Sequence, residues 1–250
     1  MHAPDDLWPV DPRTHSDHGG PETSDKDLVR HFKERYRDPL PPVSVESGPV
    51  KANVLHDNQI DLGQFPAPRW YGGDGGRYID TYCGVVTQDP ETGRANVGLY
   101  RGMVAGRNKI AKLMLPTQGW GGHFGKHRNT KEKMPVALVH GWHDVLPFCA
   151  GSPFPRRVCE WDMMGAILGK PVELVKCDTH RDNPIMRGAL EGARPGFPSE
   201  DSALCAYSWS AIAWNMLEDA GVDGVLDVWM PPVVTGMNIV VQIQKRYHGH

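Results

Sequence analysis

Short strand-like runs that end at glycine or proline dominate the middle of this chain of 250 residues. Tyr78 to Thr87 and Ala95 to Val104 are rich in β-formers, and the turn sequence Asp89-Pro90-Glu91-Thr92-Gly93 between them predicts a β-hairpin. Further strands are expected at Lys109 to Leu115, Val136 to His140, Val172 to Cys177, Gly224 to Met230 and Asn238 to Tyr247. Because the regular strand–helix alternation of a doubly wound sheet is missing, we expect an α+β fold around an antiparallel sheet or an antiparallel split β-barrel, with a few packed helices.

Few segments have the period of a helix. Val158 to Leu168 reads as a helix that ends at Gly169, and Ser199 can cap a longer helix that runs to Gly221. Phe124 to Lys133 is a third, polar candidate. The first 48 residues mix Pro, Asp, His and Ser, and only Lys26 to Tyr36 has helical character. We therefore expect a mobile N-terminal arm with one short helix over residues 1–48 and a single domain over residues 49–250.

Charge and hydropathy exclude some classes of partner. The 27 basic and 30 acidic side chains leave a net charge of −3, which provides no bulk attraction to nucleic acid or to an anionic membrane. No apolar run reaches the roughly 18 residues of a spanning helix, and the N-terminus lacks the apolar core of a signal peptide. The five cysteines include no CxxC pair, which is typical of reduced thiols. We expect a cytoplasmic protein with neither nucleic acid nor membrane as partner.

An arginine stands on the apolar face of a predicted strand. In Ala95 to Val104, strand alternation places Arg101 with Val97, Leu99 and Met103, where a guanidinium needs an anion. A structural ion pair and a bound anionic ligand both satisfy this need. Asn96 lies on the other face of a regular strand, unless a bulge at Gly98 or Gly102 brings it to the same site.

Glu160 is likewise a charged residue on the apolar side of a predicted element, in this case a helix. It precedes Met163, Met164 and Ile167 by three, four and seven positions, so it lies on the apolar stripe. A carboxylate there needs a metal, an arginine or a backbone N–H of the first helical turn. The residues alone do not choose between ligand and capping charge.

Two histidine pairs are candidates for a metal site or for ordinary surface residues. His123 follows the glycine-rich stretch Gly119 to Gly122, and His127 comes four residues later. His140 and His143 stand at the end of a predicted strand. No dinucleotide-binding, P-loop or nucleophile-elbow spacing is present, so no such chemistry is predicted.

Five ordered segments resemble the UbiD family of decarboxylases. They are Gly72-Gly-Asp-Gly-Gly-Arg-Tyr-Ile79, Thr87-Gln-Asp-Pro90, Asn96-Val-Gly-Leu-Tyr-Arg101, Glu160-Trp-Asp-Met-Met-Gly-Ala-Ile-Leu-Gly169 and Val172-Glu-Leu-Val-Lys-Cys-Asp178. The similarity runs from about Gly48 to His250. The resemblance implies a split-barrel site for prenylated FMN, with Mn2+ or another divalent metal and K+ at its phosphate. It also implies non-oxidative, reversible decarboxylation of a small aromatic or α,β-unsaturated carboxylic acid.

The resemblance assigns roles to individual residues. Asn96 and Glu160 would ligate the metal, and Arg101 would be the catalytic residue that holds the substrate carboxylate beside the cofactor. The family supplies a third metal ligand as a histidine directly after a glutamine, but here Gln118 is followed by Gly119, and His123 is the nearest replacement. Asn96, Arg101, Gln118, Ser152 and Glu160 together would contact the cofactor.

The departures from the family pattern matter equally. The family continues after Asp178 into a segment with an E-x-x-x-x-E motif that carries its proton donor, whereas this sequence passes through Thr179 directly to His180. Glu191 and Glu200 are the nearest downstream carboxylates and lie outside that pattern. The family's C-terminal domain, which contributes to oligomer contacts, is also missing. The domain over residues 49–250 therefore resembles an incomplete UbiD domain, and three alternatives remain: an active decarboxylase, a non-catalytic flavin-binding or structural remnant, and a subunit of a homo-oligomer or hetero-complex that needs a partner chain for its glutamates.

Overall fold

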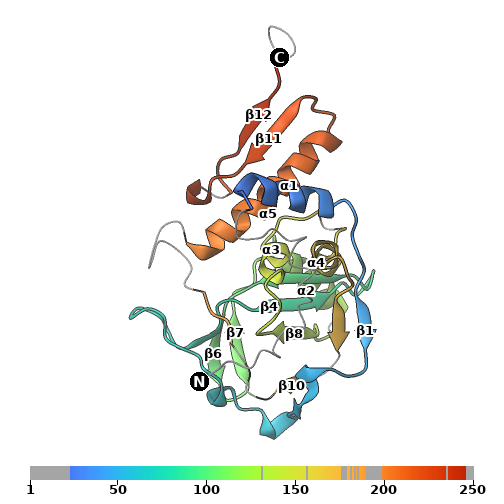
Figure 1. Ribbon diagram of the computed structural model, residues 1–250. Helices are drawn as coiled ribbons and strands as arrows, with labels where there is room; N and C mark the ends of the chain where they lie inside the picture. Colours follow the sequence, from blue (N-terminus) through green and yellow to red (C-terminus); the bar gives the residue numbers. More distant parts are fainter. Residues whose placement is uncertain are drawn as a thin grey trace.

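The computed structural model describes residues 23–130, 132–155, 157–175, 179–180, 182, 184, 186–189, 199–234 and 236–245. Helices and strands are mixed, and the strands form two three-stranded and three two-stranded sheets (Figure 1). The expected α+β class is confirmed. The sheets do not close into a barrel within the described residues, and the split barrel stays a prediction.

The first three-stranded sheet contains the predicted hairpin. β4 (Gly84–Gln88) lies between β5 (Ala95–Leu99) and β8 (Val136–Val139), and it is antiparallel to both. In the connecting turn the Asp89 carboxylate accepts the backbone N–H of Glu91 at 2.9 Å, and Gly93 adopts a φ of 71°. The turn chemistry that predicted the hairpin is therefore the chemistry that forms it.

The second three-stranded sheet begins where two predicted strands break. β6 (Gly102–Gly106) lies between β3 (Tyr78–Asp80) and β7 (Lys109–Lys112), again antiparallel to both. The run Tyr78 to Thr87 is thus divided between β3 and β4, and the run Ala95 to Val104 between β5 and β6. Each run passes from one sheet to the other, so strand alternation does not continue through it.

Tyr100 explains the second break. A Cβ atom at Gly98 would clash with the Tyr100 ring, so glycine makes room for this ring to fold back over β5. The pairing of β5 with β4 is regular from Ala95 to Leu99, and the bulge considered at Gly98 is not formed. Glycine is needed here because the Tyr100 ring comes close to the backbone, and not because the strand is irregular.

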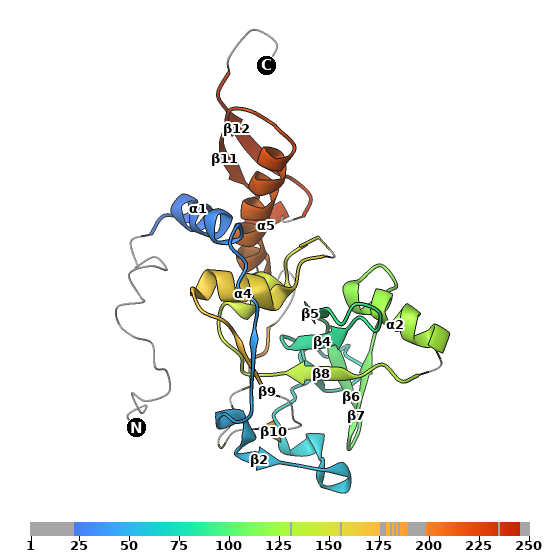
Figure 2. The same cartoon turned by 90° about the vertical axis from the view of Figure 1, so that its right-hand side faces the viewer.

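Helices form a layer beside the sheets. α1 (Asp25–Arg35) packs on α5 (Glu200–Asp219), and α3 (Leu146–Ala150) and α4 (Glu160–Leu168) lie beneath them (Figure 1). α2 (Gly119–Thr130) lies apart from these helices, beside β4 and β5 (Figure 2). Phe32 of α1 meets Phe148 of α3 edge to face at 5.0 Å. α4 ends at Gly169 in the left-handed conformation, as predicted. α2 begins at Gly119, five residues before the predicted start, and α3 was not predicted.

Three strand pairs complete the fold. β1 (Val43–Val45) and β9 (Glu173–Val175) are parallel, whereas β2 (Asn53–Val54) pairs antiparallel with β10 (Thr179–His180), and β11 (Val225–Trp229) with β12 (Val240–Ile243). Single 3-10 turns stand at Pro49–Lys51, Asp57–Gln59, Leu62–Gln64 and Pro232–Val234. None of the described helices has the length and hydropathy to span a bilayer. The arm before residue 23 and Glu191 lie outside the described residues.

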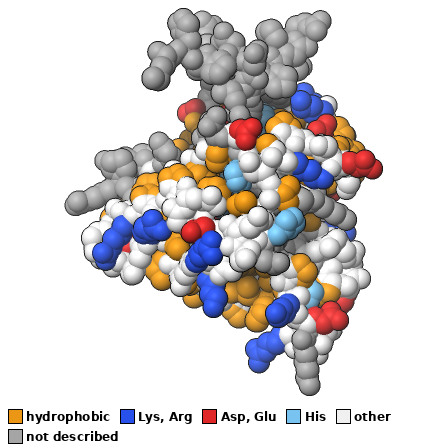
Figure 3. Space-filling model, turned by 90° about the horizontal axis from the view of Figure 1, so that it is seen from below, with side chains coloured by type: hydrophobic (Ala, Val, Ile, Leu, Met, Phe, Trp, Pro, Cys, Tyr) orange, Lys and Arg blue, Asp and Glu red, His pale blue; other side chains and the backbone are white. Residues whose placement is uncertain are grey.

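Basic side chains do not gather into one patch on the face seen in Figure 3. They are spread among hydrophobic, acidic and histidine side chains. This distribution agrees with the near balance of charges in the sequence.

Candidate functional site

The candidate site is built on β5, because α2, α3 and α4 all contact this strand. β5 is an edge strand, so the outward N–H of Val97 is free of the sheet. Oε2 of Glu160, the first residue of α4, accepts a hydrogen bond from that N–H at 2.9 Å. Its other oxygen, Oε1, accepts Nδ2 of Asn96 at 3.0 Å. The structure therefore brings together the two residues that the resemblance assigned to the metal.

Glu160 is a buried carboxyl with no cationic partner in the part of the chain that the structure describes. It is 7% exposed, and no described Lys, Arg or His side chain forms an ion pair with it. Burial raises its pKa to about 7, although the N–H of Val97 and the Asn96 amide work in the opposite direction. At neutral pH the site thus holds a carboxyl on the border of ionisation, which a nearby cation would convert fully to carboxylate.

Two aromatic residues that the sequence analysis missed position Asn96. The Tyr100 and Trp120 rings stack with centroids 4.5 Å apart and planes 7° from parallel. The Tyr100 hydroxyl donates to Oδ1 of Asn96 at 3.4 Å, and burial raises the Tyr100 pKa to about 12, so this donor keeps its proton. Gly98, which admits the ring, was the signal that could have indicated it.

Gln118 belongs to the same cluster through Trp120. The indole Nε1 donates to Oε1 of Gln118 at 2.8 Å, and the same oxygen accepts the backbone N–H of Leu115 at 3.3 Å. Gln118 therefore fixes the Trp120 ring at the start of α2. The predicted contact of Gln118 with a cofactor stays a prediction.

The position after Gln118 has no room for a histidine while Asn96 keeps its place. A Cβ atom at Gly119 would lie 2.6 Å from the Asn96 amide. One helical turn further along α2, Nδ1 of His123 lies 3.0 Å from Oγ1 of Thr87, the residue directly opposite Asn96 in the sheet. Burial lowers the pKa of His123, which favours the neutral ring that binds metals. His123 thus shares the face of Asn96, although its hydrogen bond goes to Thr87.

Arg101 lies differently from what was expected, whereas the predicted contact of Ser152 with a cofactor stays a prediction. Arg101 is exposed and makes no ion pair with a described residue, so the prediction that it is buried among Val97, Leu99 and Met103 is wrong. The cause is the break after β5, which releases Arg101 from the strand alternation. Ser152 donates to the carbonyl of Phe148 and bonds Ser208 of α5, so it joins α3 to α5.

The donor set fits a hard divalent cation. Carboxylate and amide oxygens are suitable ligands for Mn2+ or Mg2+, and a neutral imidazole accepts Mn2+ as well. Glu160, which is buried and has no ion-pair partner among the described side chains, supplies the charge that such a cation needs. Asn96, Glu160 and His123 are the residues that would hold it.

The fold resembles solved decarboxylase structures. HmfF from Pelotomaculum thermopropionicum, an evolved dimeric form in complex with prFMN, superimposes with a TM-score of 0.79 over 90% of this chain and 63% of its own, at 22% identity. Vanillic acid decarboxylase from Sedimentibacter hydroxybenzoicus in its closed form gives a TM-score of 0.79 over 90% and 59%, at 24% identity. At these identities the likeness shows the shared fold.

Sequence comparisons agree with the structural ones. The pyrrole-2-carboxylic acid decarboxylase of Pseudomonas aeruginosa is 34% identical over 66% of this chain and 32% of its own length. Ferulic acid decarboxylase 1 of Saccharomyces cerevisiae is 32% identical over 64% of this chain and 33% of its own length. The chain thus spans about a third of the curated relatives it matches. Residues 42–190 match the family model of the UbiD 3-octaprenyl-4-hydroxybenzoate carboxy-lyase Rift-related domain. That match covers more than half of the chain, which therefore belongs to the UbiD family.

Proposed function

We propose that this chain is the cofactor-binding part of a UbiD decarboxylase, which binds prenylated FMN through a divalent metal. The observation that carries the proposal is the buried Glu160 carboxyl, held by Asn96 and the N–H of Val97 and lacking a described cationic partner. A cation between Glu160 and Asn96 would replace their 3.0 Å hydrogen bond and keep Glu160 ionised. His123 is the proposed third protein ligand, and K+ would accompany the metal at the phosphate.

The reaction that we infer is non-oxidative decarboxylation of an aromatic or α,β-unsaturated acid. Prenylated FMN would supply the electron sink for the pair left by departing CO2. Arg101, exposed and unpaired among the described residues, is available to hold a substrate carboxylate by two parallel hydrogen bonds. Tyr100 and Trp120 would keep Asn96 oriented and exclude water from the buried side of the site.

A flavin-binding chain that does not turn over alone is the second candidate. The family's E-x-x-x-x-E segment, which carries its proton donor, has no counterpart in this sequence between Asp178 and His180. The described residues around Glu160 offer no second carboxylate that contacts it. A partner chain that supplies the missing acid would restore the reaction. The vanillic acid decarboxylase of Sedimentibacter hydroxybenzoicus is named ShVdcCD, and one of its structures contains a truncated ShVdcD, which suggests a second component.

Flavin retention tests the proposed cofactor site. The chain would be incubated with prenylated FMN and Mn2+, desalted, and its flavin absorbance compared with that of the Glu160→Gln and Glu173→Gln variants. Glu173 is an exposed carboxylate on β9 and serves as the matched control. We expect the wild type and Glu173→Gln to keep the flavin and Glu160→Gln to lose it. Equal retention by all three proteins would refute the metal-linked site.

A further inference from the structure

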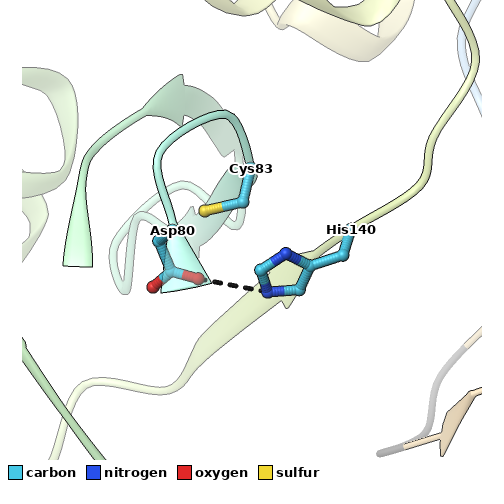
Figure 4. A group of neighbouring side chains, drawn as sticks. All are labelled: Asp80, Cys83 and His140. Atoms are coloured by element: carbon cyan, nitrogen blue, oxygen red, sulfur yellow. Dashed lines mark ion pairs between the residues drawn. The ribbon is translucent and has the colours of Figure 1, made fainter. Parts of the chain in front are cut away.

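A second cluster of ligand-type side chains lies at the junction of the two three-stranded sheets. Asp80 ends β3, Cys83 directly precedes β4, and His140 directly follows β8. The ligating atoms of these three residues all lie within 4.8 Å of one another. Figure 4 shows the Cys83 sulfur and the His140 ring both directed toward the Asp80 carboxylate. None of the three takes part in the site around Glu160.

Asp80 is completely buried in this cluster. Its Oδ1 faces Nε2 of His140 at 3.1 Å, and its Oδ2 faces Nζ of Lys112, at the end of β7, at 2.7 Å. Although burial alone would raise the pKa of Asp80, His140 and Lys112 lower it, so the group is a carboxylate. Each oxygen thus faces one nitrogen and has no further hydrogen-bond partner among the described residues. A fully buried carboxylate with unused lone pairs is a strong ligand for a cation.

The backbone makes space for the cluster at Gly102. This residue of β6 pairs with both Asp80 and Lys112, and a Cβ atom there would clash with Oδ2 of Asp80 and lie 3.0 Å from Nζ of Lys112. Glycine at this position therefore lets charged side chains of β3 and β7 meet over the middle strand. One oxygen of Asp80 is committed to Lys112, and the other points toward His140.

We propose that Asp80, Cys83 and His140 form a binding site for Zn2+ that clamps the two three-stranded sheets together. A donor set of one oxygen, one sulfur and one imidazole nitrogen favours Zn2+ over Mg2+, Ca2+ or Mn2+. The 3.1 Å separation between Oδ1 of Asp80 and Nε2 of His140 already approximates one edge of a zinc tetrahedron. The Cys83 sulfur, which lies within 4.8 Å of both of these atoms, would supply the third ligand, and a water would supply the fourth.

Metal binding would change the protonation of Cys83. Burial raises the pKa of this thiol, which therefore stays protonated in the metal-free protein. Formation of the Zn–S bond breaks the S–H bond, and the proton leaves to solvent. The sulfur keeps its electron pair, so no oxidant or reductant takes part. Lys112 stays near Oδ2 of Asp80 and limits the affinity by repulsion, because its ammonium and the metal share one carboxylate.

Co2+ as a probe tests this site separately from the one around Glu160. A thiolate bound to Co2+ gives a charge-transfer band in the near ultraviolet, and Asn96, Glu160 and His123 cannot produce it. We expect the full chain to develop this band on titration with Co2+ and to lose it on addition of Zn2+. The Cys83→Ser and His140→Ala variants should fail to develop it, whereas the Cys205→Ser control should develop it as the wild type does.

Binding without a spectroscopic probe supplies the second measurement. Equilibrium dialysis of the Glu160→Gln variant, whose proposed Mn2+ site is disabled, should retain one Zn2+ per chain, and Zn2+ should raise its Tm. Absence of the band in the wild type, or its persistence in Cys83→Ser, would show that the cluster is an ion pair between Asp80 and Lys112 with a neighbouring thiol. Retention of flavin by the wild type would be unaffected by that result.

Discussion

Glu160 is the residue on which the proposed function rests, and its ionisation should be visible in the stability of the metal-free chain. Its carboxyl has a pKa of about 7 in the folded protein, against 4.5 for an ordinary glutamate. The folded state therefore binds the extra proton between these two pH values, and the free energy of unfolding falls as pH rises from about 4.5 to about 7. The full loss amounts to about 3 kcal/mol.

Urea denaturation at a series of pH values, with a metal chelator present, measures this effect. We expect Glu160→Gln to reduce the decrease in the free energy of unfolding with rising pH, because an amide does not titrate. Glu173→Gln should leave this decrease unchanged. Addition of Mn2+ to the wild type should reduce the fall, since a cation favours the carboxylate. An identical pH dependence in wild type and Glu160→Gln would assign the titration to another group.

Gly98 is a second residue with a measurable consequence. Alanine at this position clashes with the Tyr100 ring, which is fixed by its stack on Trp120. We expect Gly98→Ala to lower the free energy of unfolding by about 1–3 kcal/mol, as other overpacked substitutions do. Chemical denaturation provides the measurement, with Tyr100→Phe as a comparison that keeps the stack. A stability equal to that of the wild type would mean that the ring moves aside at little cost.

At the scale of elements, the glycines of α2 separate into two kinds. A Cβ atom at Gly121 would clash with the backbone of Leu115, and one at Gly119 would meet Asn96, whereas Gly122 and Gly125 have nothing within 4 Å. Gly122→Ala and Gly125→Ala should each stabilise the chain by about 0.5–1 kcal/mol, because alanine favours a helix. Gly121→Ala should destabilise it. Thermal denaturation of the three variants would contradict this division if all shifted Tm in one direction.

The elements also show what the sequence could predict. The β4–β5 hairpin follows from the turn at Asp89 to Gly93, and the end of α4 follows from Gly169, because both signals are local. The start of α2 could not be predicted, since glycine disfavours helices and the reason for it here is contact with Leu115 and Asn96. The break at Tyr100 also depends on a distant residue, Trp120, and the misplacement of Arg101 follows from it.

The candidate site shows the same limit. Asn96 and Glu160 were predicted as partners from a resemblance, and the structure joins them by a hydrogen bond between residues 64 positions apart. Tyr100, Trp120 and Thr87 were missed, because aromatic and threonine side chains in strands are ordinary core residues until their contacts are known. His140 was considered only together with His143, and its grouping with Asp80 and Cys83 was missed, since it lies on a different run from these two residues.

At the scale of the whole molecule, we expect the chain alone to have little decarboxylase activity. A positioned acid typically contributes about 10²–10⁴-fold to a rate, and the segment that carries the family's acid is missing. The exposure of Arg101 also lets water weaken its hold on a carboxylate. CO2 release from a panel of cinnamic and hydroxybenzoic acids, with prenylated FMN and Mn2+ present, measures this activity. Ferulic acid decarboxylase 1 of Saccharomyces cerevisiae is the positive control, and turnover by the lone chain at the control's rate would show that another residue replaces the lost acid.

The packing of α1 on α5 constrains the order in which parts of the protein fold during synthesis. Tyr36 bonds Ser208 at 2.6 Å, and Asn215 bonds the carbonyl of Lys33 at 2.9 Å, across 172 and 182 residues of sequence. On the ribosome, the apolar side of α1 with Val29 and Phe32 has to wait until α5 has emerged, since contacts of such long separation close last. During synthesis the sheets can therefore fold before the helical layer. Until α5 has been synthesised, the apolar side of α1 stays exposed to chaperones and proteases.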